Sequence, residues 1–159
     1  MSVSGQLRKI EQRIRAKAHI VAETVCNQIM EETKEKLRFL TMKNWYNNYD
    51  PKVYRRSYDF VKSIVGKVTH LGLTYTIEVK FDSQLIKPEY RHNEGWNAHM
   101  SFDQSPFTEE LIDVIEFGAT GIQSNPRRGY GAHMLKDTQS WLNQYAKKEF
   151  QQRFQQSFK

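Results

Sequence analysis

The histidines are the residues of this 159-residue chain that most invite a search for chemistry, and there are five of them. His92 and His99 are seven residues apart, whereas zinc sites use tighter pairs and supporting cysteines that this stretch lacks. His133 and Asp137 are four residues apart in a predicted helix, which permits a hydrogen bond between them. No motif places a serine or cysteine nucleophile beside that pair. We therefore expect His133 to have a surface or capping role.

The segment 118–131, GATGIQSNPRRGYG, is rich in glycine and carries Arg127 and Arg128. It lacks the Gly-Lys-Ser/Thr of a phosphate-binding loop, and no predicted strand leads directly into it. The two arginines could touch phosphates, but a solvated loop tip accounts equally for the composition. We expect no catalytic, cofactor-binding or metal-binding residues, no cofactor and no enzyme activity.

An aromatic and basic stretch, NWYNNYDPKVYRRSYDF, begins at Asn44. Two interpretations fit it: a nucleic-acid surface on which bases stack, or a joint between a helix and a sheet. Asp50-Pro51 breaks the helix, because proline lacks a donor and disfavours helical backbone just before it. We favour a structural joint or subunit contact, in which Tyr54, Tyr58 and Phe60 alternate onto one face as a strand begins. Its residues are Trp45, Tyr49, Pro51, Tyr54, Arg55, Arg56 and Tyr58.

A long helix, residues 4–44, precedes this stretch. Apolar or small residues recur along it in steps of three and four, as on one face of a helix: Leu7, Ile10, Ile14, Ala18, Val21, Val25, Ile29, Thr33, Leu37 and Leu40. At about 1.5 Å per residue such a rod is longer than the core of a chain this size. We expect part of it to project or to pack on another subunit.

The first half of the predicted helix is basic. Its positive residues are Arg8, Lys9, Arg13, Arg15 and Lys17, relieved by Glu11. We consider three roles for this set: an ordinary solvated face, a partner face, or a face towards DNA.

The remaining elements predict an α+β fold in a single domain, residues 1–159. A β-hairpin is expected at about 57–82, with His70-Leu71-Gly72 as the connection and Leu73, Tyr75, Ile77, Val79 and Phe81 on one face. An irregular loop, 83–106, leads to a short helix at 107–118, with Leu111, Ile112 and Ile115 inward. A long helix at 133–158 ends the chain. We expect a small antiparallel sheet packed against these helices.

Composition restricts the function further. The net charge of +6 permits a polyanionic partner without establishing one. A single cysteine, Cys26, allows no internal disulfide and is expected to be a buried thiol. The sequence shows no membrane-spanning run and no signal-peptide core at its N-terminus. We expect a soluble protein made in a cytoplasm, without membrane association.

The order of these landmarks resembles the gene-product-ten-like family of head–tail connector or tail-completion proteins of long-tailed bacteriophages. Members carry a segment similar to P-x-x-Y-x-R-(S/T)-Y, matched here by Tyr49, Pro51, Tyr54, Arg56, Ser57 and Tyr58. A second similarity is Ile115-Glu116-Phe117-Gly118. The resemblance covers the chain from about Leu37 onward, although the loop from Ser83 to Ser105 is longer than the family pattern.

The resemblance implies a structural virion protein made in the host cytoplasm, without catalysis or cofactor. Such a subunit forms a homo-oligomeric ring in the phage neck, between the portal or connector and the tail tube or tail terminator. DNA would pass through the lumen without sequence-specific contact, and the basic half-helix could face it. The alternative is an independent, non-sequence-specific nucleic-acid-binding protein.

Overall fold

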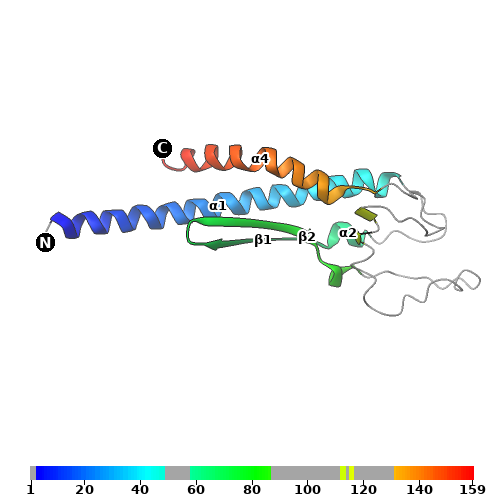
Figure 1. Ribbon diagram of the computed structural model, residues 1–159, viewed down its shortest axis with the longest axis horizontal. Helices are drawn as coiled ribbons and strands as arrows, with labels where there is room; N and C mark the ends of the chain where they lie inside the picture. Colours follow the sequence, from blue (N-terminus) through cyan, green and yellow to red (C-terminus); the bar gives the residue numbers. More distant parts are fainter. Residues whose placement is uncertain (1–2, 49–57, 87–111, 114, 117–130) are drawn as a thin grey trace, which may run out of the picture.

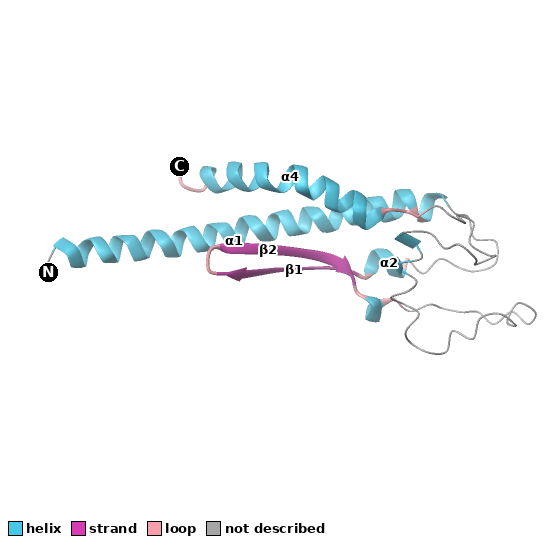
Figure 2. Ribbon diagram, in the orientation of Figure 1, coloured by secondary structure: helices cyan, strands magenta, loops and turns pink. Residues whose placement is uncertain are grey.

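A computed structural model describes residues 3–48, 58–86, 112–113, 115–116 and 131–159. Helix α1, Val3–Asn44, is the longest element and runs along the described part of the molecule, as Figure 1 shows. Helix α4, Met134–Gln156, lies along one side of it, and a β-hairpin lies along another (Figure 2). The hairpin and α4 both stop well short of the N-terminus of α1 (Figure 1). The α+β class and the long helices at both ends of the chain are confirmed.

The hairpin pairs strand β1, Ile64–Leu71, with strand β2, Thr74–Phe81, in antiparallel register. Tyr75, Ile77, Val79 and Phe81 are the less exposed residues of β2, so the predicted alternation is confirmed for them. The predicted connection, His70-Leu71-Gly72, is wrong, because the two turn residues are Gly72 and Leu73. Gly72 has φ of 60° while Leu73 does not have a positive φ, as a turn with glycine at its first central position requires.

The prediction that a strand begins near Tyr58 is also wrong. Asp59–Lys62 forms one helical turn, α2, and the preceding Tyr58 has φ of 59°. In a strand, Lys62 would share the inward face with its neighbours two residues away on either side. The helical turn leaves Lys62 exposed while Phe60 and Ile64, four residues apart, are both buried.

The main apolar core lies at the C-terminal end of α1. Phe60 and Phe81 meet edge to face there, with ring centres 5.8 Å apart. The buried residues of this core are Leu37, Leu40, Tyr46, Phe60, Ile64, Phe81, Ile86, Ile115, Ala132 and Met134. Towards the N-terminus, α1 continues this buried face with Ala22, Val25, Cys26, Ile29, Met30 and Thr33. Cys26 is 3% exposed, as predicted for a buried thiol.

Two remaining predicted elements are described in part. The loop expected at 83–106 opens with a 3-10 turn, Ser83–Leu85, which Asp82 caps by accepting from the Gln84 N–H at 3.0 Å. In the helix expected at 107–118, residues 112–113 and 115–116 are helical, and Ile112 and Ile115 pack on the core as predicted. The rest of both segments, including Leu111, lies outside the described residues.

Candidate interaction surface

The first turns of α1 form a helix that the rest of the described chain does not cover. Residues 6–17, called the rod below, are all exposed. The rest of the chain begins to cover α1 at the end of the rod, where the Lys17 ammonium lies 5.0 Å from the centre of the Phe158 ring, just after α4. Two residues further on, His19 Nδ1 and the Tyr75 hydroxyl of β2 are 2.7 Å apart. The prediction that part of the helix projects is therefore confirmed.

The apolar stripe predicted along α1 divides into two parts. From Val25 onward its members are buried, whereas Leu7, Ile10 and Ile14 on the rod are 61%, 53% and 58% exposed. Burying an apolar side chain contributes a stabilising free energy of about 25 cal/mol for each Å² of apolar surface removed from water. The exposed stripe of the rod would therefore contribute this stabilising free energy only if a further contact buried it.

All five basic residues predicted as a DNA or partner face stand on the rod: Arg8, Lys9, Arg13, Arg15 and Lys17. With Glu11 as the single acid, the rod carries five positive charges minus one, or +4 of the chain's +6. Arg15 pairs with Glu11 at 2.7 Å, and both side chains are largely exposed. Such an exposed pair contributes little to stability, so the rod remains a strongly positive surface.

The predicted joint is described at its two ends. The Trp45 side chain packs against the core, and the backbone N–H of Trp45 donates to the Thr41 carbonyl at 3.1 Å. Tyr58 is 40% exposed, and its ring centre lies 4.8 Å from that of the buried Tyr46. Tyr49, Pro51, Tyr54, Arg55 and Arg56 lie outside the described residues. The aromatic contact brings the end of α1 to the start of α2, while the role of the joint stays a prediction.

Several contacts that hold α4 in place were not predicted. Glu32 of α1 accepts from the Tyr145 hydroxyl at 2.9 Å and pairs with Arg153 at 2.9 Å. Loss of water contact and the bond to Glu32 raise the pKa of Tyr145. At the N-terminus of α4, the buried Glu116 accepts from the backbone N–H groups of Leu135 and Lys136, each at 2.9 Å. None of these contacts has a signature in sequence spacing, because the partners are 19 to 121 residues apart.

His133 precedes α4 at the N-cap position with φ of 49°, and its side chain makes no capping hydrogen bond. His133 is exposed, so the surface role is confirmed, whereas the capping role is not, because Glu116 rather than the imidazole supplies the side-chain cap. His19 and His70 form a different cluster, with ring centres 5.8 Å apart beside Tyr75. Among the described residues, no group of three or more His, Cys, Asp or Glu side chains is placed to hold a metal ion.

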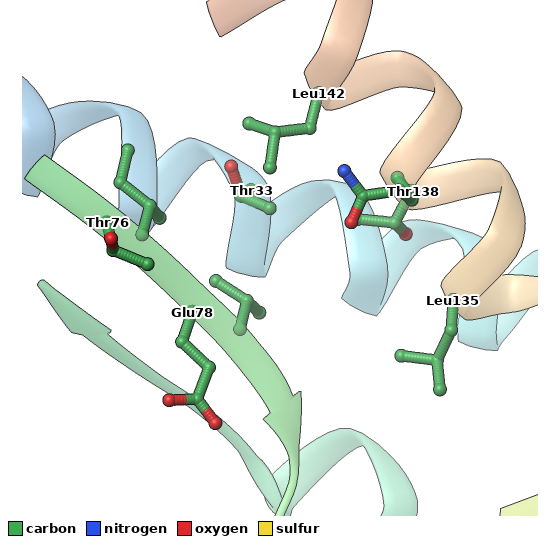
Figure 3. Close-up of a pocket in the computed structure, with 9 residues that line it drawn as sticks. Thr33, Thr76, Glu78, Leu135, Thr138 and Leu142 are labelled. Atoms are coloured by element: carbon green, nitrogen blue, oxygen red, sulfur yellow. The ribbon is translucent and has the colours of Figure 1, made fainter.

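A groove of about 350 Å³ lies between β2 and α4, with Thr33 of α1 among its walls (Figure 3). The hydroxyls of Thr33 and Thr138 both donate to carbonyls of their own helices, at 2.7 Å each. Glu78, the charged residue of the lining, pairs with Lys80 at 3.0 Å. The groove therefore presents no convergent set of reactive groups, and the rod is the surface with the clearer potential for function.

Comparison with known proteins agrees with a phage origin. The family model named YomN matches residues 6–159, nearly the whole chain. This chain belongs to the YomN family. The namesake comes from the SPbeta prophage region of Bacillus, so the family is phage-associated. The matched family is YomN and not the gene-product-ten-like connector family that the sequence resembles.

The other comparisons add no relatives. No curated protein and no solved structure matches the chain. No helix in the described part of this YomN-family protein is long and apolar enough to span a membrane.

Proposed function

We propose that this YomN-family chain is a structural subunit of the phage neck, a head–tail connector or tail-completion protein. It assembles as a ring between the portal or connector and the tail tube or tail terminator, around the passage for DNA. The phage-associated family supports the viral part of this proposal. The connector resemblance, carried by residues such as Pro51, Tyr54 and Arg56, supports the place in the virion.

The observation that carries the proposal is the exposed stripe of the rod. A monomer that acts alone rarely leaves an ordered apolar face uncovered, and such faces mark contacts with other proteins. Leu7, Ile10 and Ile14 follow the same three-and-four spacing as the buried part of α1. This surface suits a subunit that is completed by its neighbours in an assembly.

The charge of the rod is compatible with a position near DNA. Lys and Arg side chains bind the phosphate backbone through charge alone, without reading sequence. A lumen through which any genome sequence passes requires this kind of contact. The proposed partners are therefore other copies of the chain, the adjoining neck and tail proteins, and DNA in the lumen.

Deletion of the gene from the phage tests this proposal. Without a neck subunit, DNA-filled heads and finished tails should accumulate separately, and plaque formation should fall by several orders of magnitude. Supplying the unaltered chain from a plasmid should restore joined particles, whereas an Ile10→Glu variant should restore few. Normal virions from the deletion would contradict the proposal.

An independent, non-sequence-specific nucleic-acid-binding protein is the second candidate, and the +4 charge of the rod favours it. Such a protein binds duplex DNA by itself, with an affinity that falls steeply as salt increases. Fluorescence anisotropy of a labelled duplex, titrated with the protein at two salt concentrations, distinguishes the candidates. Tight, salt-sensitive binding together with normal virions from the deletion would favour this second function.

A further inference from the structure

Exposed apolar residues are concentrated at one end of the molecule. In the described part of the chain, ten large apolar side chains are exposed. Seven of them belong to the rod, to the segment next to it, to the hairpin tip or to the residues just after α4: Leu7, Ile10, Ile14, Ile20, Leu71, Leu73 and Phe158. A cluster of this kind indicates a surface that another molecule covers.

The hairpin turn is the most exposed part of this cluster. Leu71 is 87% exposed and Leu73 is 84% exposed, on either side of Gly72. Gly72 satisfies the backbone requirement of the two-residue turn, so the turn itself gains nothing from leucine beside it. We call Leu71–Leu73 the tip. Its two leucines form a small apolar surface at the end of the hairpin, whose two strands are paired along their length.

Within one copy, the tip and the rod stripe both stay exposed, so they do not cover each other. The hairpin is fixed to α1 at His19, where Tyr75 and His70 contact the imidazole. Ile10 and Leu7 lie nine and twelve residues before His19, or about 13 and 18 Å further along a helix that rises 1.5 Å per residue. One copy therefore leaves two apolar surfaces uncovered, and a second copy can cover them.

Charge favours pairing of a rod with a tip over pairing of two rods. Two rods side by side would bring +4 against +4 within a short distance. The hairpin segment 68–77, VTHLGLTYTI, contains no Lys, Arg, Asp or Glu. It can lie against a basic helix without like-charge repulsion.

We propose that the rod stripe of one copy packs on the hairpin tip of the next copy. Different surfaces of the two copies meet in this contact, so its repetition generates a ring if the rotation closes. The inference deepens the proposed function and rests on it for the closed ring. One contact involves few side chains, so we expect self-association only at high protein concentration, or when several contacts form together.

Disulfide trapping tests the contact directly. An Ile10→Cys variant and a Leu73→Cys variant are mixed at high concentration and oxidised, and cross-linked peptides are identified by mass spectrometry. The native Cys26 is buried and does not compete in the folded protein. We expect the 10–73 disulfide to be at least tenfold more abundant than the 12–73 disulfide from a matched Gln12→Cys control. Gln12 is exposed on the opposite side of the rod.

Each outcome decides the proposal. A 10–73 disulfide above the control supports the rod-to-tip contact. A 10–10 disulfide from Ile10→Cys alone, in excess of the 10–73 product, would show rod-to-rod pairing and overturn it. Equal yields from Ile10→Cys and Gln12→Cys would also overturn it. If the 10–73 disulfide forms but the gene deletion leaves virions normal, the contact stands and the neck function falls.

Discussion

At the scale of single residues, Glu116 links two segments that are distant in sequence. Its side chain is 1% exposed, and its carboxylate accepts from the two N–H groups that begin α4. Those N–H groups have no partner within the helix and lie at the positive end of its dipole. A buried carboxylate is stable at this position because both oxygens are hydrogen-bonded.

Replacing Glu116 by Gln removes the negative charge and leaves one accepting oxygen. We expect Glu116→Gln to lower the free energy of unfolding by about 1–2 kcal/mol, the usual effect of losing a helix cap. Urea denaturation followed by circular dichroism measures this. Asp113→Asn, on the exposed side of the same segment, is the matched control. Equal stability of the two variants would show that the cap contributes nothing.

Cys26 gives a second prediction at this scale. Burial raises the pKa of its thiol, so the reactive thiolate is less populated near pH 8 than in an exposed cysteine. We expect iodoacetamide to label the folded protein at least tenfold more slowly than the urea-unfolded protein, as followed by intact mass. Equal labelling rates in the two states would contradict the buried position of Cys26.

At the scale of elements, Gly66 allows the hairpin to lie close to α1. A Cβ at this position would lie 2.8 Å from Cγ and Sδ of Met30, and 2.9 Å from Cδ of Lys34. These distances are too short, so a side chain at residue 66 must displace Met30 or the strand. The absence of a side chain is therefore part of how the sheet packs.

Gly66→Val should destabilise the fold by about 1–3 kcal/mol, the range for overfilled interiors. Thermal unfolding by circular dichroism provides the measurement. Val65→Ile, next to it on the other face of β1, adds bulk away from α1 and serves as the control. If Gly66→Val unfolds at the same temperature as that control, the close approach of strand and helix is not correct.

The elements that sequence predicted best are those with long, regular patterns. The three-and-four spacing of α1 from Val25 onward and the alternation from Tyr75 to Phe81 each report one buried face, which many residues specify together. The boundaries were harder. The helical turn α2 forms because it keeps Lys62 exposed. The hairpin turn lies at Gly72-Leu73 because glycine readily adopts the positive φ that this turn requires. The core decides the first, and the backbone of glycine decides the second, so neither follows from a long regular pattern.

The candidate surface was predictable only in part. The basic residues of the rod were evident from the sequence. The predicted helix was longer than the core, which implied that part of it projects from the body of the protein. The exposure of Leu71 and Leu73 was not predicted, because Leu73 fits the inward face of the strand if the hairpin connection is placed earlier. The Glu32–Tyr145–Arg153 contacts link distant segments, so no spacing rule reaches them.

At the scale of the whole molecule, the fold separates a packed body from the rod. Deletion of residues 2–14 should change the free energy of unfolding by less than about 1 kcal/mol, since the rod residues are exposed. The same deletion should abolish self-association at high concentration, measured by sedimentation velocity. A matched variant, Arg8→Gln with Arg15→Gln, keeps the stripe and should still associate.

Either of two results would contradict this division. Loss of cooperative unfolding in the deletion variant would show that the rod stabilises the body. Unchanged self-association without the rod would show that the copies meet through another surface.

We propose that this YomN-family chain is a structural subunit of the phage neck. Cryo-electron microscopy of purified virions of the phage that encodes it is the decisive experiment for this proposal. We expect a ring of this fold between the portal and the tail tube, with the rod of each copy against the hairpin tip of the next. A neck reconstruction fully explained by other proteins, with this chain absent from the virion by mass spectrometry, would contradict it.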